Sequence, residues 1–533
     1  MKKRFLLILS LALISVSPNY GQVTTIEKGL QAITSDGIKA QLGFLSSDWT
    51  EGRETGEKGE YLASDYIASM LQLYGVKPYG GYQRGSGHTN NNPDNERSFF
   101  QNFILLKSIT DDEQTFKVKS TNGKAIKSTD FTYNVDFILR PSDPGVEFEA
   151  PVVFTGYAYK NDKFKYNDFN KLDVKGKFIL KVAGSPLFIT EVLSSSELIS
   201  STRELESELK EMGVLGIIEF NPRKTVVGHP DLKDFMNMSP SENYPGSGRH
   251  RARYSIPGKT NNNNLIRIAV SAKTANEILE GSSINIEDYI KKADANKPYI
   301  ISIITDKSVY LKTTVKTTQV AVRNVVGIIE GNNPDQVIVL GAHYDHLGIN
   351  NGYIWNGADD NGSGTVGVMT LAKAIMATGK KPEKTIIIAL WTAEEVGLLG
   401  SRYYLQNLDY PINNIKLNAN FDMISRYISE DEPNNVTMTY TSSLTGLQNL
   451  TISNLQTYGI DLTVDYQPSA DPPGGSDHRS FVASGVPIMR FKPGHREEYH
   501  TPLDEPETVD WDIMEKIIKI SFTNVWEMAN TTW

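Results

Sequence analysis

In the second half of the chain, short continuous apolar runs alternate with segments whose apolar residues recur at helical spacing. Short apolar runs predict buried strands at 336–345, 384–391, 415–421, 461–466 and 486–491. Between them, apolar residues recur at helical spacing and predict helices at 362–379, 397–406, 443–458 and 510–529. Strands that alternate with helices predict an α/β domain with a mixed, mostly parallel sheet flanked by helices.

The first half of the chain has a different pattern. Residues 136–300 contain strand-like runs, a strongly amphipathic helix at 195–213 and a long polar stretch at 224–264. We interpret this block as an inserted α+β domain that separates residues 22–135 from 301–533 of the main domain. Strict alternation over 308–331 predicts an antiparallel edge hairpin. Residues 26–76 predict a helix, a loop and a helix, and the loop at 51–59 could form the rim of a site.

The N-terminus and the composition limit the class of protein. A basic start, an apolar run at 5–16 and a polar exit predict a secretory signal peptide at 1–21, and hence a periplasmic or extracellular protein. That run and every later one are too short for a membrane span. Net charge is −9, or −12 without the three basic residues of the predicted leader, which argues against a nucleic-acid partner. The chain has no cysteine, so any metal must be held by His, Asp and Glu.

Histidine and acidic residues follow the predicted strands. They are His343 and Asp345, the pair Asp359–Asp360 in a glycine-rich turn, the pair Glu394–Glu395, and Asp422. Ligands of open α/β sheets collect at the carboxyl ends of strands, so these side chains are expected to converge. We expect a two-metal hydrolase site there.

The spacing suggests a role for each group. Residues two apart in a strand share a face, so Asp345 could orient the ring of His343, while His346 would point away. An aspartate of the 359–360 pair could bridge two cations about 3.5–4 Å apart, although the pair also fits a helix N-cap. Adjacent side chains diverge, so one glutamate could bind metal while the other acts as general base.

Other motifs narrow the class of enzyme. Five of the eight histidines lie between residues 340 and 500, and Asp504 follows His500 by four residues as a candidate partner. The chain has neither the GxSxG of serine hydrolases nor the HExxH of single-zinc peptidases. A GxGxxG at 362–367 follows an acidic turn rather than a strand, which argues against a dinucleotide site.

Six motifs together resemble the co-catalytic di-zinc peptidases of clan MH, which include secreted bacterial aminopeptidases and the glutamate carboxypeptidase II type. The motifs are GAHYDHLG, NGADDNGSGT, AEEVGLLGS, NANFDM, SDHRSF and YHTPLDE. The resemblance implies the zinc exopeptidase fold, and the inserted block resembles the protease-associated domain of that family.

The resemblance also implies two zinc ions per chain and a role for each matching residue. His343 and Asp422 would bind one zinc, Glu395 and His500 the other, and Asp360 would bridge them. Glu394 would be the general base, with Asp345 behind His343 as a further catalytic residue. The supporting or site-lining residues would be His478, Asp359, Asp504 and Tyr499. A cis peptide is implied between Asp359 and Asp360.

The expected function is that of a secreted or periplasmic zinc exopeptidase acting on peptides, and an aminopeptidase in particular. A carboxypeptidase or dipeptidase stays an alternative, because recognition of a substrate carboxylate needs an arginine and three lie near the motifs, Arg479, Arg490 and Arg496. A glutaminyl cyclase-like transferase with one zinc and a non-catalytic receptor-like module are further alternatives. The residues leave the side-chain preference and the oligomeric state open.

Overall fold

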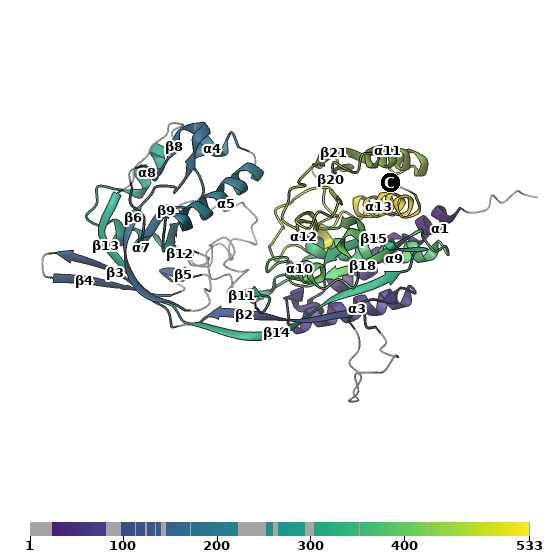
Figure 1. The fold of residues 1–533 in the computed structure, drawn as a ribbon, viewed down its shortest axis with the longest axis horizontal. Coiled ribbons are helices and arrows are strands. Elements are labelled where there is room, and N and C mark those ends of the chain that lie inside the picture. The colour runs from purple at the N-terminus through teal and green to yellow at the C-terminus, as the bar shows by residue number, and fades with distance from the viewer. Residues whose placement is uncertain are drawn as a thin grey trace, which may run out of the picture.

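The computed structural model describes residues 24–81, 97–139, 145–221, 252–258, 265–293 and 303–531, except 112, 123–124, 134, 171, 194, 351 and 428. The predicted signal peptide lies outside these residues. Two lobes are joined by the long strands β2 (Phe100–Thr110) and β14 (Val315–Ile329), as Figure 1 shows. Within the described ranges, no helix has the length and apolar character that crossing a membrane requires.

The larger lobe is built on a ten-stranded mixed sheet. Its order is β11 (Ala252–Ser255), β2, β14, β18 (Lys384–Trp391), β15 (Asn333–His343), β19 (Ile415–Asn420), β22 (Ile488–Lys492), β20 (Asn435–Thr441) and β21 (Thr463–Ser469), with β1 (Lys77–Pro78) beside β14. The parallel arrangement expected from the sequence covers the four central strands, β18, β15, β19 and β22, and the β20–β21 pair. Their other neighbours are antiparallel.

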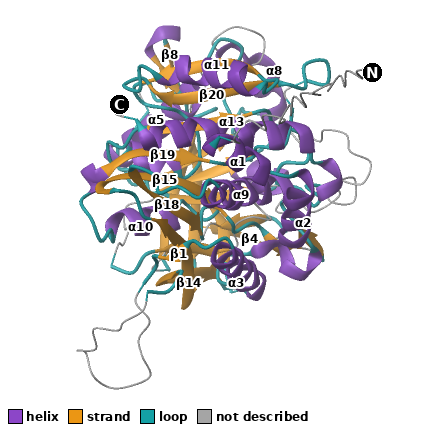
Figure 2. Ribbon diagram, turned by 90° about the vertical axis from the view of Figure 1, so that its right-hand side faces the viewer, coloured by secondary structure: helices purple, strands orange, loops and turns teal. Residues whose placement is uncertain are grey.

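Helices cover both faces of this sheet (Figure 2). They are α1 (Thr25–Ala32), α2 (Ser35–Leu45), α3 (Lys58–Leu73), α9 (Gly364–Ala377), α10 (Leu399–Gln406), α11 (Leu447–Tyr458), α12 (His478–Val482) and α13 (Trp511–Asn530). Ile338 and Leu340 of β15 belong to one hydrophobic core, and Val337 and Val339 to another. Because both faces of this strand are buried, its sequence is continuously apolar.

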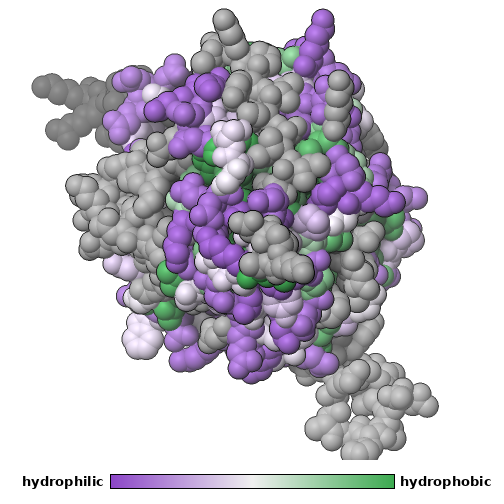
Figure 3. All heavy atoms as spheres, turned by 90° about the vertical axis from the view of Figure 1, so that its left-hand side faces the viewer, coloured by the Kyte–Doolittle hydropathy of each residue, from purple (hydrophilic) through white to green (hydrophobic). Residues whose placement is uncertain are grey.

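The smaller lobe has its own sheet and core. The strand order is β4 (Ala125–Phe131), β3 (Thr115–Asn122), β13 (Ile303–Lys312), β6 (Glu147–Phe154), β9 (Phe178–Val182), β10 (Gly216–Phe220), β12 (Ile266–Val270) and β5 (Phe137–Leu139). Its helices are α4 (Leu187–Thr190), α5 (Ser195–Glu211), α7 (Ala272–Leu279) and α8 (Ile286–Ala293). The sheet therefore extends beyond 136–300 on both sides. Figure 3 shows the described part of its outer face as mainly hydrophilic.

The short elements lie mostly around the site or in the second lobe. They are the 3-10 helices η1 (Asp48–Arg53), η2 (Asp162–Phe164), η5 (Ile412–Asn414) and η6 (Pro506–Thr508), the π-helical turn η4 (Ala358–Ser363), and the strands β7 (Lys160–Asn161), β8 (Tyr166–Asn167), β16 (Gly348–Asn350) and β17 (Tyr353–Trp355). The pairs β7–β8 and β16–β17 are two-stranded hairpins.

The predicted hairpin at 308–331 is wrong. β13 pairs with β3 and β6 in the smaller sheet, whereas β14 lies between β2 and β18 in the larger one. Alternation of apolar and polar residues identifies a strand and its buried face, but the partner is chosen by packing across the molecule. Strand β20 was also missed, although its sequence NVTMTYT alternates the buried Val436, Met438 and Tyr440 with threonines.

Candidate metal centre

The candidate site lies at the carboxyl ends of the central parallel strands. β15 ends at His343, β18 is followed by Glu394 and Glu395, and β19 by Asp422. The turn η4 carries Asp359 and Asp360 into the same region ahead of α9. The expected convergence of these residues therefore occurs, for the geometric reason that parallel strands end at one edge of a sheet.

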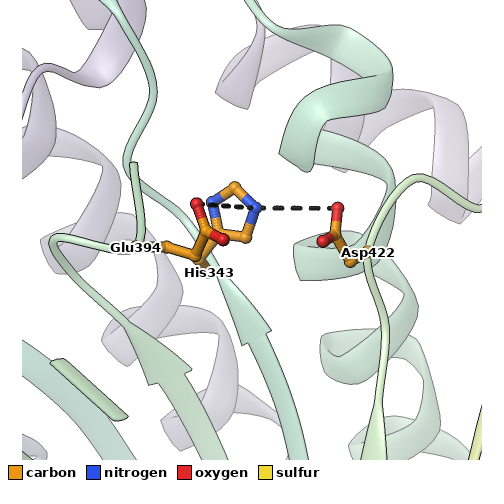
Figure 4. Close-up of side chains that lie close together, drawn as sticks. All are labelled: His343, Glu394 and Asp422. Carbon is orange, nitrogen blue, oxygen red and sulfur yellow. Dashed lines mark ion pairs between the residues drawn. The ribbon is translucent and has the colours of Figure 1, made fainter. Parts of the chain in front are cut away.

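One group of ligand atoms surrounds the ring of His343 (Figure 4). Its Nε2 lies 4.0 Å from Glu394 Oε2 and 3.7 Å from Asp422 Oδ1. Suitable donor atoms of these three residues all lie within 4.8 Å of one another. Such spacing fits three groups placed around a single cation, because metal–ligand bonds of about 2.0–2.3 Å separate ligand atoms by less than about 4.6 Å.

A second group lies on the other side of Asp360. His500 Nε2 is 2.6 Å from Asp360 Oδ2 and 3.3 Å from Glu395 Oε1. The other oxygen of Asp360, Oδ1, lies 3.4 Å from His343 Nε2. The two oxygens of one carboxylate thus face two histidines from different groups, which is the arrangement of a carboxylate placed between two cations.

His346 belongs to this second group, and the prediction that it points away is wrong. Its Nδ1 lies 2.9 Å from Glu395 Oε1, and its ring is buried. Because β15 ends at His343, the two-residue alternation of a strand no longer applies three residues later. Burial lowers the pKa of His346, so the neutral ring donates Nδ1–H to Glu395.

Asp345 acts on the two glutamates more than on His343. Its carboxylate accepts the backbone N–H groups of Glu394 (3.1 Å) and Glu395 (3.3 Å) and the hydroxyl of Thr55 (3.0 Å). The ring nitrogen Nδ1 of His343 lies 3.2 Å from the Asp345 backbone oxygen and 3.8 Å from its carboxylate. The predicted carboxylate–imidazole bond is thus replaced by a carbonyl–imidazole bond, since the carboxylate is engaged by the next strand's loop.

The acids flanking the bridge hold the turn in place. Asp504 accepts the N–H groups of Asp359 and Asp360, each at 2.9 Å, rather than forming the expected pair with His500. Asp359 Oδ1 accepts Ser425 Oγ–H at 2.7 Å and so faces away from both histidine groups. The expected cis bond between Asp359 and Asp360 is wrong, because it joins Asp360 and Asn361.

The crowding of charge separates the carboxyl groups into two kinds. Burial and the charge of Glu395 oppose ionisation of Asp360, but bonds from His343 and His500 lower its pKa to about 2. Despite burial, the pKa of Glu395 is well below its ordinary value because His500 and His346 stabilise the carboxylate. Burial raises the pKa of Glu394 well above its ordinary value, although His343 opposes this, and nearby carboxylates add to the rise.

Among the remaining predicted residues, His478 and Tyr499 border the site. His478 Nε2 lies 3.0 Å from the Pro473 carbonyl oxygen, and burial lowers its pKa to about 3. A neutral ring that donates to a carbonyl fits the prediction that it lines the site without being a ligand. The ring of Tyr499 lies against that of His500, with centroids 3.5 Å apart.

Two further residues were not identified as site residues from the sequence. Arg53 is buried and donates to the carbonyl oxygens of Leu45 (2.5 Å), Tyr344 (2.7 Å), Asn356 (2.6 Å) and Gly357 (2.9 Å). It stands in the 51–59 loop, where the cluster of charged and glycine residues was the available signal. Asp477 is buried, which raises its pKa to about 7, and its charge helps to raise the pKa of Glu394.

The donor set fits divalent cations. Each group offers imidazole nitrogen and carboxylate oxygen, which suit zinc, and would also suit manganese or cobalt. Asp360, Glu394, Glu395 and Asp422 would repel one another in a buried site unless cations were placed among them. With no thiolate in the chain, these His and carboxylate donors are the ligands available for zinc.

Comparison with known proteins identifies a peptidase family for part of the chain. Residues 324–525 match the model of peptidase family M28. Leucine aminopeptidase 2 of Trichophyton rubrum is 35% identical over 170 residues, which cover 31% of this chain and 32% of that protein. Leupeptin-inactivating enzyme 1 of Streptomyces exfoliatus is 32% identical over 172 residues, 31% of this chain and 34% of that protein. The match thus spans about a third of these relatives' length.

Solved structures share the fold over nearly the whole chain. The aminopeptidase from Aneurinibacillus sp. strain AM-1 superposes with a TM-score of 0.56 at 16% identity, covering 95% of this chain and 97% of that one. BSAP, a zinc aminopeptidase from Bacillus subtilis, gives a TM-score of 0.53 at 18% identity, covering 94% and 96%. These structures confirm the expected fold class. The match of residues 324–525 to peptidase family M28 confirms the peptidase resemblance, whereas the protease-associated domain stays a prediction.

Proposed function

We propose that this protein, whose residues 324–525 match peptidase family M28, is a zinc-dependent exopeptidase that binds two zinc ions. The observation that carries the proposal is the position of Asp360. Its Oδ1 lies 3.4 Å from His343 and its Oδ2 lies 2.6 Å from His500, with a glutamate beside each histidine. His343 and Asp422 would hold one ion, Glu395 and His500 the other, and Asp360 both.

Zinc bound there supplies a Lewis acid and lowers the pKa of a coordinated water toward about 7. Glu394 is the general base. Its carboxylate lies in the first group, 4.0 Å from His343 Nε2, and burial raises its pKa above the ordinary value, which favours a group that accepts a proton. Glu394 removes a proton from the attacking water and delivers it to the leaving peptide nitrogen, while Asp345 holds its backbone in place.

The favoured activity within this class is that of an aminopeptidase. The names of the relatives, leucine aminopeptidase and zinc aminopeptidase, support this choice over a carboxypeptidase or dipeptidase. The two groups of candidate donor atoms support it over a cyclase with one zinc. The closeness of His343 to Asp422 and of His500 to Asp360 and Glu395 supports it over a receptor-like module. We further propose that residues 1–21 direct export and that the smaller lobe is a protease-associated domain forming one wall of the site.

Replacing Glu394 with Gln tests the catalytic assignment. Loss of the general base should lower kcat by about 10²- to 10⁴-fold, while zinc content stays near two per chain. Activity on peptide substrates and elemental analysis would be measured together, with Glu211→Gln in the exposed part of α5 as the matched control. Turnover at the wild-type rate in Glu394→Gln would rule out this role. A single bound zinc would favour the cyclase alternative.

A panel of peptides tests which end is cleaved. The free peptide and its C-terminal amide should be hydrolysed, and the N-acetylated peptide should not be, because an aminopeptidase acts next to a free α-amine. Incubation with a chelator should abolish turnover, and added zinc should restore it. Cleavage of the N-acetylated peptide would contradict the aminopeptidase assignment.

A further inference from the structure

Two basic side chains stand together on β22, next to the metal centre. Arg490 and Lys492 are two residues apart and partly exposed, whereas Met489 and Phe491 between and beside them are buried. They therefore share the face of the strand that is turned away from the core. β22 pairs with β19, the strand that leads into Asp422.

These cations lack a carboxylate partner among the described residues. Arg490 Nη1 lies 3.5 Å from His478 Nδ1, and Lys492 Nζ lies 3.2 Å from His495 Nε2 and 3.7 Å from Met423 Sδ. Within the part of the chain that the structure describes, neither makes an ion pair within 4.0 Å. Partly buried cations are usually paired, because desolvation of an unpaired charge is costly.

The loop before α12 packs directly over the guanidinium of Arg490. A Cβ added at Gly474 would lie 2.7 Å from Arg490 Nη1 and 3.0 Å from His478 Cε1. Gly474 has φ +125°, a conformation open to glycine. Gly475 has no atom within 4 Å of an added Cβ, so the loop is close to Arg490 on one side and open on the other.

The carboxylates of the metal centre are the source of counter-charge for Arg490 and Lys492. Burial lowers the pKa of both cations, and Asp422 is the acid that opposes this lowering most strongly. Divalent cations held by Asp360, Glu395 and Asp422 would compensate these carboxylates, so Asp422 would no longer serve as a counter-charge for Arg490 and Lys492. A substrate carboxylate would supply the missing counter-charge.

We propose that Arg490 and Lys492 bind a carboxylate of the substrate and so select peptides that carry one close to the scissile bond. This inference rests on the proposed exopeptidase function and adds its substrate class. The carboxylate has two sources, the C-terminus of a dipeptide and the side chain of an aspartyl or glutamyl residue. Guanidinium and ammonium groups bind both through charge-assisted hydrogen bonds.

Binding to the inactive Glu394→Gln protein, loaded with zinc, tests the proposal without turnover. Calorimetry would compare two matched pairs of peptides, Ala-Ala with Ala-Ala amide and Asp-Ala with Asn-Ala. A charge-assisted contact should make Kd about ten- to a hundred-fold lower for the acidic member of at least one pair. Arg490→Met and Lys492→Met in the same background should each remove most of that preference.

Controls separate charge from packing. Arg402→Met and Lys416→Met remove exposed cations elsewhere on the same lobe and should keep the full preference. Lys492→Arg keeps the positive charge and should retain most of the preference for the acidic peptide. A purely structural role for Lys492 predicts instead that Lys492→Arg and Lys492→Met have the same effect. A preference in the first pair alone identifies the C-terminal carboxylate, and in the second pair alone the acidic side chain.

Equal Kd values within both pairs would overturn the proposal, as would a preference that survives in both methionine variants. Failure of the underlying function is read separately. If wild-type protein loaded with zinc hydrolyses none of the four peptides, the exopeptidase assignment fails, whereas the binding comparison still reports on the two cations.

Discussion

At the scale of single residues, the position of each carboxylate in the centre depends on backbone geometry after a strand. Ala393 has φ +58°, in the left-handed region, and turns the chain after β18. Asp345 then accepts the N–H groups of both following glutamates. Glu394 is thereby directed to His343, and Glu395 to His500 and His346. Adjacent glutamates acquire different pKa values because their neighbours differ.

His346 should contribute to metal affinity through Glu395. Replacing it with Ala removes the 2.9 Å hydrogen bond to Glu395 Oε1. The affinity for one of the two zinc ions should therefore fall by about ten- to a hundred-fold. Competition with a chromophoric chelator measures both affinities. His346→Gln, which keeps a donor, should recover part of the loss, and unchanged affinity in His346→Ala would show that the bond is dispensable.

Glu60 should make stability depend on pH. It accepts the N–H of Gly56 at 2.6 Å and contacts the Thr392 hydroxyl, and burial raises its pKa from 4.5 to about 8. Between these values the folded protein holds a proton that the unfolded chain has released. Protonated Glu60 contributes fully to the free energy of unfolding below about pH 4.5, and this contribution is lost as pH rises through about 8. The loss is up to about 1.4 kcal/mol per pH unit.

Glu60→Gln should remove that contribution. After treatment with chelator, the urea concentration at the unfolding midpoint should fall less between pH 5 and 8 for Glu60→Gln than for wild type. The reason is that glutamine bears no titratable proton. The Glu211→Gln variant, altered at an exposed position, should follow the wild-type curve. Parallel curves for wild type and Glu60→Gln would contradict the raised pKa.

At the scale of elements, the N-terminal segment supports a site made by residues some 300 positions later. The Arg53 side chain joins the end of α2 at Leu45, the segment after β15 at Tyr344 and the turn before η4 at Gly357. Thr55 reaches Asp345, and β14 lies between β2 and β18. These contacts reach the ligands from behind and support the centre, and the prediction that the 51–59 loop forms the rim of the site stays a prediction.

Arg53→Lys should break the hydrogen bonds that connect these elements while keeping the positive charge. A lysine cannot reach four carbonyl groups, and each buried acceptor left without a donor costs about 1–3 kcal/mol. We expect a lower thermal midpoint and weaker zinc binding, measured by calorimetry and chelator competition. Arg402→Lys, at an exposed position, should change neither, and normal zinc affinity in Arg53→Lys would show that the contact only stabilises the fold.

At the scale of the whole molecule, the two lobes have separate cores and all proposed ligands come from one of them. Two strands connect the lobes, and where they enter the smaller one Thr110 pairs with Val315 and Asp111 N donates to Thr314 O at 3.1 Å. The chain on either side of the smaller lobe is therefore already held as adjacent antiparallel strands. The smaller lobe contributes none of the proposed ligands, so we expect the centre to form without it.

Replacing residues 112–313 with Asn-Gly tests this independence. The dipeptide favours a tight hairpin turn between Asp111 and Thr314, and the shortened protein should remain soluble and bind two zinc ions. The deletion also removes β11, which leaves β2 as an edge strand, so a modest loss of stability is expected. Zinc content and peptide selectivity would be measured together. A soluble protein without zinc would show that the smaller lobe is needed to build the centre.

The amino-acid pattern is enough to predict the central strands, the helices after them and the residues that converge at their ends. Apolar runs such as 384–391 predict buried strands locally, and parallel strands must bring His343, Glu394 and Asp422 to one edge. Recognition of six motifs added His500, which lies 78 residues beyond Asp422 and has no local pattern that marks it as a neighbour.

The contacts between side chains follow from the folded arrangement and not from the local sequence. It placed β13 and β14 in different sheets, directed Asp345 to the glutamates, brought His346 to Glu395 and left Arg490 and Lys492 without a carboxylate among the described residues. Periodicity is a property of a few consecutive residues and specifies which face is buried. Partners are selected by packing, hydrogen bonding and charge across hundreds of residues, which no local pattern contains.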